Sequence, residues 1–173
     1  MAPWLDGYLL TLDGEFDQGV RVLRESLRSS PDFLTRWLLA VALAYQGRRE
    51  EACALFAASA TDDPRNILLR IGTGLRHALV GDRESAWEIL RSDLDVSSTT
   101  QRDFGYALWV ADCHALLGDA EGTLEWLERS VALGCINYPF LNRHDPFLAP
   151  LRAEPRFQQL MERVKQAWAS FEA

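Results

Sequence analysis

The amino-acid sequence predicts an all-α fold, an α-solenoid of about four helix hairpins closed by a C-terminal helical cap. Glycines recur at intervals of 33, 34 and 37 residues, at Gly14, Gly47, Gly81 and Gly118. A small residue stands seven positions before each glycine, and another stands five positions after it. A large apolar residue follows each glycine at a distance of nine positions. Features that stay in phase over successive units indicate a repeat of this length.

The helix-hairpin geometry of each unit explains why these positions carry a turn glycine and small residues. Glycine at the turn permits the left-handed backbone that ends one helix before the next begins. The paired small residues let two antiparallel helices approach closely. These pairs are Gly7 with Gly19, Ala40 with Ala52, Gly74 with Ala86, and Ala111 with Thr123. Because one hairpin cannot bury its apolar face alone, neighbouring units are expected to share a core.

Each unit is predicted to contain two helices. The first helices are expected near residues 3–13, 34–46, 68–80 and 103–117. The second helices are expected near residues 16–29, 49–61, 83–93 and 120–132. The array therefore spans residues 1–133, in units of about 1–33, 34–66, 67–102 and 103–133. Residues 134–173 form a separate capping segment.

The connections between units carry their own signals. Ser30-Pro31 and Asp63-Pro64 are predicted to close the first two units. The unit between Gly81 and Gly118 contains three extra residues, which fit best in the loop Ser97–Thr100. Thr100 with Asp103 resembles a capping box that starts the following helix.

The first two units resemble the tetratricopeptide (TPR) repeat. The segments GEFDQGVRVLRESLRSSP and GRREEACALFAASATDDP follow that family's order of turn glycine, small residue, large residue and closing proline within about 34 residues. The later units keep the hairpin pattern without the proline. The resemblance implies a right-handed superhelix that binds other proteins or peptides, and it says little about which ligand is bound.

Residues 134–173 depart from the repeat phase and are interpreted as a cap over the fourth hairpin. Asp145-Pro146 resembles a helix start, and Glu154-Pro155 opens the last helix in the same way. Along that helix, apolar side chains recur at a spacing of three to four residues, at Phe157, Leu160, Met161, Val164, Trp168 and Phe171. This spacing predicts a single apolar stripe.

The capping segment is also similar to the end of TPR arrays attached to bacterial serine/threonine protein kinases and related regulators. That similarity implies an alternative function, a regulatory or sensor arm that binds a small ligand or relays a signal. The sequence contains neither a glycine-rich ATP loop nor a His-Arg-Asp loop. Met1 lies almost at the start of the first predicted helix, so we expect either a fragment of a longer array or a ragged first hairpin.

Composition points to a cytoplasmic domain. A net charge of −7 argues against nucleic acid or an anionic membrane as partner. Arg21, Arg24 and Arg28 share one helix face, which we interpret as a solvated outer surface. The longest apolar run, Trp37–Tyr45, is too short to span a bilayer, and no signal peptide is evident. Three cysteines without metal-binding spacing suit reduced thiols.

The sequence offers little evidence for a catalytic or metal-binding site. Cys113 and His114 are adjacent on a predicted helix, so their side chains point in different directions and cannot pair. His77 and His114 occupy equivalent positions and are interpreted as a packed, hydrogen-bonded pair. Gly72 and Gly74 are interpreted as helix-packing residues, because no strand precedes them. The sequence therefore predicts no enzyme activity, no metal and no cofactor.

The inner, concave face is the predicted partner-binding groove, because the TPR resemblance places its binding positions on the first helix of each unit. These positions are Trp4, Tyr8, Trp37, Val41, Tyr45, Ile71, Leu75, Leu108 and Asp112. Two interpretations stay open. Either the residues form an apolar cradle for a peptide or helix, or tight winding buries them against neighbouring helices. A small apolar ligand and self-association into a homo-oligomer are further alternatives.

Overall fold

The computed structural model describes residues 3–60, 63 and 65–172, and every regular element within them is helical. Four hairpins follow one another: α1 (Pro3–Leu12) with α2 (Phe16–Ser29), α3 (Phe33–Tyr45) with α4 (Arg49–Ala60), α5 (Ile67–Leu79) with α6 (Arg83–Ile89), and α7 (Phe104–Leu116) with α8 (Ala120–Ala132). We call them hairpins 1 to 4. Except at the end of α6, the helix ends lie within one residue of those predicted.

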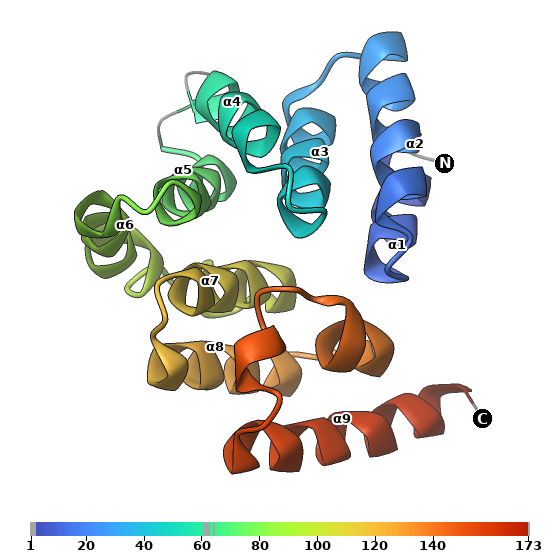
Figure 1. The fold of residues 1–173 in the computed structure, drawn as a ribbon, viewed down its shortest axis with the longest axis vertical. Helices are drawn as coiled ribbons and strands as arrows, with labels where there is room; N and C mark the ends of the chain where they lie inside the picture. The colour runs from blue at the N-terminus through green and yellow to red at the C-terminus, as the bar shows by residue number, and fades with distance from the viewer. Residues whose placement is uncertain (1–2, 61–62, 64, 173) are drawn as a thin grey trace.

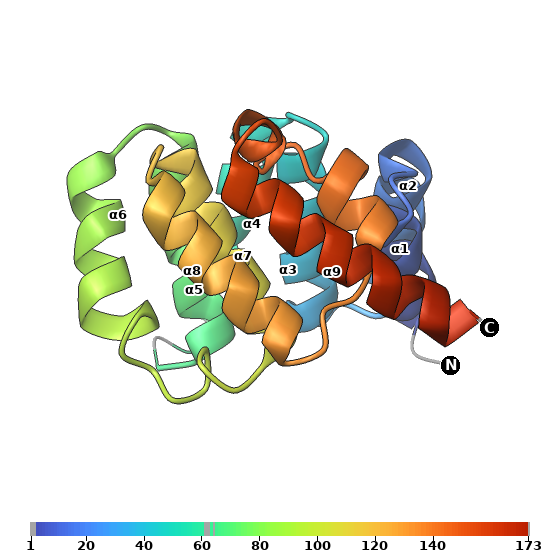
Figure 2. The ribbon, with the colours of Figure 1, turned by 90° about the horizontal axis from the view of Figure 1, so that it is seen from below.

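The hairpins follow one another in an arc. In Figure 1 the arc runs from α1 and α2 through α3 to α6 and returns through α7 and α8. Each first helix contacts the first helix of the next hairpin, so α1, α3, α5 and α7 form the inner layer. The second helices α4, α6 and α8 lie on the outer side of α3, α5 and α7 (Figure 1), and Figure 2 shows α8 and the C-terminal helix α9 (Pro155–Glu172) together on one face. The chain is therefore an all-α solenoid of helix hairpins.

The glycines and small residues act as predicted. Gly14, Gly47, Gly81 and Gly118 have φ values of 81°, 81°, 78° and 70°, in the left-handed region that favours glycine. In hairpin 1 the helices pack so closely that a Cβ atom on Gly19 would lie 2.9 Å from the carbonyl oxygen of Gly7. The prediction of close packing at the small-residue positions is confirmed in hairpin 1.

Hairpin 3 differs from its prediction at the end of its second helix. The α-helix stops at Ile89, and the chain continues as a π-helical turn, η1 (Leu90–Leu94). The buried Thr100 hydroxyl donates to the carbonyl oxygens of Leu94 at 2.6 Å and Ser97 at 2.8 Å, which fixes the loop against this turn. The predicted capping box is wrong for Thr100, since Asp103 alone caps α7 by accepting from Tyr106 N at 2.9 Å.

The capping segment contains a π-helical turn, η2 (Phe140–His144), a 3₁₀ turn, η3 (Ala149–Leu151), and α9 (Pro155–Glu172). Pro155 begins α9 as predicted, whereas Asp145 does not start an α-helix. Its carboxylate caps a short turn by accepting from Phe147 N at 2.9 Å. In α9, which packs on α8, the apolar stripe is buried as far as Val164.

Two further observations complete the fold. None of the helices in the described part of the chain is long and apolar enough to cross a membrane. The turn predicted at Asp63-Pro64 lies partly outside the described residues, because Pro64 is not among them. The division between the repeat array and the cap at residue 133 stays a prediction.

Candidate functional site

The nine predicted groove residues lie on the inner helices α1, α3, α5 and α7, and most are inaccessible. Trp4 and Tyr8 in α1 are half-buried. The other seven are at most 5% exposed: Trp37, Val41, Tyr45, Ile71, Leu75, Leu108 and Asp112. Of the two interpretations left open by the sequence, burial of these seven residues by tight winding describes this structure, and an open cradle along them does not. Whether these residues contact a partner stays a prediction.

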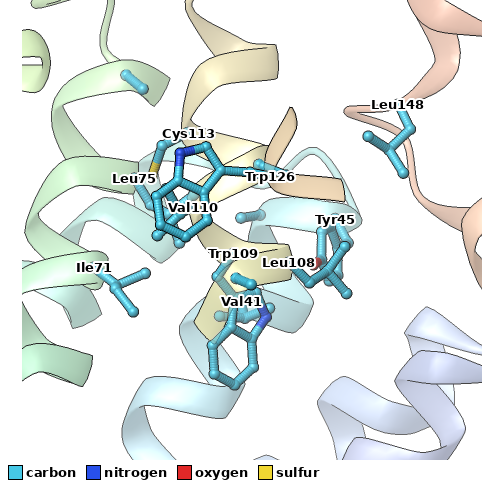
Figure 3. Close-up of a cluster of buried hydrophobic side chains, with 14 of the residues drawn as sticks. Val41, Tyr45, Ile71, Leu75, Leu108, Trp109, Val110, Cys113, Trp126 and Leu148 are labelled. Carbon is cyan, nitrogen blue, oxygen red and sulfur yellow. The ribbon is translucent and has the colours of Figure 1, made fainter. Parts of the chain in front are cut away.

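The inner face is filled by aromatic packing between hairpins that are not neighbours. The Trp37 ring of hairpin 2 lies edge-on to Trp109 of hairpin 4, with ring centroids 4.3 Å apart. Tyr8 of hairpin 1 contacts the same Trp109 at 6.4 Å. Figure 3 shows part of the buried cluster around Trp109 and Leu108. Hairpin 4 therefore reaches back to hairpins 1 and 2 across the inner face.

The packing around Trp37 explains a glycine in α5. A Cβ atom on Gly72 would lie 2.6 Å from Trp37 Nε1 and 2.8 Å from a ring carbon of Phe56. The prediction that Gly72 serves helix packing is confirmed. Trp109 was not among the predicted groove residues, although a large aromatic residue beside an inner-face position is a signal that could have identified it.

Tyr45 joins the inner face to the capping segment. Its ring contacts Phe140 at 5.5 Å and Phe147 at 5.2 Å between centroids. Its hydroxyl donates to Asp112 Oδ2 at 2.7 Å, which links hairpin 2 to hairpin 4. We call residues 135–151 the crossing segment, because they lie across the inner face between these hairpins.

A pair of buried carboxyl groups lies beneath this contact. Asp112 of α7 is 1% exposed, and Asp145 of the crossing segment is fully buried. Burial and then the neighbouring charge of Asp145 raise the pKa of Asp112 well above its usual range. Burial also raises the pKa of Asp145, to about 6. One oxygen of each group, Asp112 Oδ1 and Asp145 Oδ2, is buried without a hydrogen-bond partner among the described residues, so the pair favours retention of a proton.

The crossing segment also reaches hairpin 1. The Asn137 side chain donates to the carbonyl oxygen of Leu12 at 3.4 Å. The His144 ring lies so close to Gly14 that a Cβ atom there would come within 2.3 Å of His144 Nδ1. The crossing segment thus contacts hairpins 1, 2 and 4 and occupies space that an open groove would leave for a partner.

An apolar cavity lies at the edge of the inner face. Its volume is about 200 Å³, and we call it the inner cavity. It is lined by Tyr8, Leu12, Phe104, Gly105, Leu108, Gly134, Cys135, Ile136, Asn137, Phe140 and Trp168. The lining is apolar apart from the Tyr8 hydroxyl, the Cys135 thiol and the Asn137 amide. Two predicted groove residues, Tyr8 and Leu108, therefore border space that a ligand can enter.

Exposed apolar side chains continue outward from the inner cavity. Phe104, which lines it, is 50% exposed. Leu133 precedes the lining residue Gly134 and is 38% exposed. Phe171 follows Trp168 by one helical turn of α9 and is 78% exposed. Large apolar side chains exposed beside an apolar cavity are typical of a binding surface.

A polar cavity of about 420 Å³ is lined in part by His114, which is itself only 4% exposed. His114 Nδ1 lies 2.8 Å from Asp119 Oδ2, and its Nε2 lies 3.2 Å from Asp95 Oδ1. Burial lowers the pKa of His114, but the hydrogen bonds to Asp95 and Asp119 outweigh this effect and raise it. Each ring nitrogen is therefore engaged by a carboxylate.

The histidine pair predicted from the sequence is wrong, because each histidine instead bonds an aspartate of its own hairpin. His77 Nδ1 lies 2.9 Å from Asp82 Oδ2, just as His114 lies beside Asp119. Both aspartates are the N-cap residues of the following helices. Within the described ranges, no cluster of histidine, cysteine, aspartate or glutamate is arranged to hold a metal ion.

Comparisons with known proteins add limited information. No protein-family model matches the sequence, and no curated protein matches it either. The chain is similar to the solved structure described as MamA MSR-1 C2, with 16% identity and a TM-score of 0.47 over 95% of both chains. It is also similar to MamA AMB-1 P212121, with 17% identity and a TM-score of 0.45 over 93% of this chain and 88% of that one. Both TM-scores lie below 0.5, and the fold assignment rests on the helices of this chain.

Proposed function

We propose that this chain is a non-enzymatic protein-interaction module that holds one bulky apolar side chain of a partner in the inner cavity. The observation that supports this proposal is the cavity itself. It lies between α1, α7 and the crossing segment and is lined almost entirely by apolar atoms. The partner segment is a peptide or an amphipathic helix, recognised through its apolar face.

The size of the cavity suits such an anchor. An apolar protein cavity of about 150 Å³ is large enough to bind benzene. The inner cavity, at about 200 Å³, is therefore large enough for an aromatic ring or a branched aliphatic side chain. Binding energy is commonly concentrated in a few such anchors, and the exposed Phe104 and Phe171 would contact the remainder of the segment.

The chemistry of the remaining reactive groups supports a binding role. The Cys113 thiol is fully buried, and burial raises its pKa well above the usual range, which disfavours the thiolate that a nucleophile needs. His114 next to it contacts Asp95 and Asp119 rather than the thiol. His114 therefore has a structural role, in which it joins the last turn of α7 to Asp119, the N-cap residue of α8.

Charged substitutions beside the cavity test the proposal. Phe104 and Phe33 are each the first residue of an inner helix, and they are 50% and 42% exposed. Only Phe104 lines the inner cavity. Immobilised wild-type chain is used to capture and identify a partner, whose affinity is then measured by titration. We expect Phe104→Glu to weaken binding by about 2 kcal/mol or more. Phe33→Glu should leave the affinity nearly unchanged, and equal effects of the two variants would contradict the proposal.

A regulatory arm is the second candidate function. The observation that favours it is the crossing segment, which is held over the inner face by Tyr45, Asp112 and Asp145. Displacing this segment would expose the buried groove residues and relay a signal. Hydrogen exchange of residues 135–151 above and below neutral pH, expressed relative to the intrinsic exchange rate at each pH, tests this candidate, since deprotonation of the carboxyl pair should lower the protection there. Unchanged protection would argue against it.

A further inference from the structure

Four arginine side chains converge on a hollow that shares no lining residue with the inner cavity. The hollow has a volume of about 300 Å³ and lies where α2 meets the turn between α3 and α4. Arg21, Arg24 and Arg28 of α2 are spaced so that they share one helix face. Arg48 of the turn lines the same space from hairpin 2. We call this site the arginine hollow.

The arginine hollow already holds one carboxylate, which shows how its guanidinium groups bind. Glu51 Oε2 accepts from Arg24 Nη2 at 2.6 Å. Glu51 Oε1 accepts from Arg48 Nε at 2.6 Å and lies 2.5 Å from Arg48 Nη2. The fork of an arginine matches both oxygens of a carboxylate, so these contacts are charge-assisted and directional.

The two outer arginines have capacity for a further anion. Arg21 and Arg28 are exposed at opposite ends of the face. Among the residues that the structure describes, no carboxylate lies within ion-pair distance of either guanidinium group. An additional anionic group at this face would therefore bind without first displacing an internal partner.

The charge of the whole molecule limits what the hollow can bind. Its lining contains four arginines and Asp17, and Glu51 pairs with two of those arginines, while the chain carries a net charge of −7. A long polyanion such as a nucleic acid would meet repulsion from the acidic surface outside the hollow. A short anionic segment that contacts only this site avoids that repulsion.

We propose that the arginine hollow is a docking site for an acidic peptide segment of a protein partner, whose carboxylates pair with Arg21 and Arg28. This site goes beyond the apolar anchor proposed above. It lies on different helices and recognises charge rather than apolar surface. One partner could engage both sites, but neither site requires the other.

Charge reversal in the full chain tests the docking site. The probe is a short fluorescein-labelled oligoglutamate peptide, and its binding is measured by fluorescence anisotropy at low salt and at about 0.15 M salt. The variant Arg21→Glu/Arg28→Glu should bind the peptide at least about tenfold more weakly than the wild type. The matched control Arg83→Glu/Arg102→Glu makes the same change in net charge at two exposed arginines on other helices and loops. It should weaken binding by less than about twofold, since it acts only through long-range charge.

Several results would overturn the docking site. One is an equal loss of peptide affinity in the two double variants. Another is that the wild type does not bind the peptide at all. The third is that the wild type binds a single-stranded oligoribonucleotide more tightly than the peptide. Circular dichroism establishes that each variant is folded. If Arg21→Glu/Arg28→Glu is not folded, Arg21→Gln/Arg28→Gln replaces it with the same expected loss. Phe104→Glu should leave peptide binding unchanged, which separates this site from the inner cavity.

Discussion

At the scale of single residues, Trp37 shows why the inner face behaves as a core. Its side chain is fully buried and lies edge-on to both Phe56 and Trp109. A binding anchor must be reachable in the free protein, whereas a core residue contributes through packing density. Trp87 on α6 contrasts with Trp37 in its burial. Its side chain is only half-buried, and the Arg91 guanidinium lies over its ring.

Truncation of the two tryptophans should therefore have different effects on folding. Trp37→Ala removes a fully buried ring, and such changes commonly lower the free energy of unfolding by about 3–5 kcal/mol. Trp87→Ala serves as the matched control and should cost clearly less, because part of that ring is solvated. Urea denaturation followed by circular dichroism measures both values. A loss of less than about 1 kcal/mol for Trp37→Ala would mean that the inner face is open in solution.

At the scale of helices, α9 and the crossing segment close the array in different ways. α9 packs on α8, where Arg156 pairs with Glu121 and Glu128, each at 2.7 Å. The crossing segment instead packs Phe140 and Leu148 into the inner layer. The cap therefore protects the end of hairpin 4 and also fills the centre of the arc.

Removing both parts of the cap tests their contribution. Deletion of residues 135–173 would expose the end of hairpin 4 and the inner face. Each large apolar side chain buried there contributes about 1.5–3 kcal/mol. Net domain stability is only about 5–15 kcal/mol. We expect aggregation or a large fall in melting temperature, measured by calorimetry and light scattering. A monodisperse truncation with the wild-type melting temperature would show that the cap is a separate arm.

The sequence predicts local elements better than it predicts contacts between distant ones. Helix ends were predictable because turn glycines such as Gly47 need a left-handed backbone whatever the tertiary structure. The sequence left closure of the groove as one of two open interpretations, because closure depends on contacts such as Trp37 with Trp109, whose hairpins are not adjacent. The repeat phase fixes each hairpin, but small rotations between successive hairpins set how tightly the array winds. For the same reason the sequence does not predict the inner cavity, although it does predict two of its lining residues, Tyr8 and Leu108, as groove residues.

At the scale of the whole molecule, three titrating groups make stability depend on pH in the same direction. The folded-state pKa values of Asp112, Asp145 and His114 are all raised. A group with a raised folded-state pKa stabilises the fold when protonated, and this contribution is lost as the pH rises through the folded-state value. For Asp145 that value is about 6.

We therefore predict that the protein unfolds more easily at about pH 8.5 than at about pH 6, both of which lie above the isoelectric point near 5.0. The difference in unfolding free energy should be on the order of 1 kcal/mol, because one unit of pKa shift corresponds to about 1.4 kcal/mol. Urea denaturation at both pH values measures it. Asp145→Asn should reduce the difference, and greater stability at the alkaline pH would contradict the prediction.

The central claim is that the solenoid is wound so tightly that hairpins 2 and 4 touch across a filled inner face. In an open solenoid each hairpin contacts only its neighbours. A double-mutant cycle of Tyr45→Phe and Asp112→Leu measures this contact directly, because the Tyr45 hydroxyl donates to Asp112 at 2.7 Å. Urea denaturation of the wild type, both single variants and the double variant gives the coupling energy. We predict a coupling of about 0.5–3 kcal/mol. Additive effects, within about 0.3 kcal/mol, would show that the two hairpins do not touch and that the inner face is open.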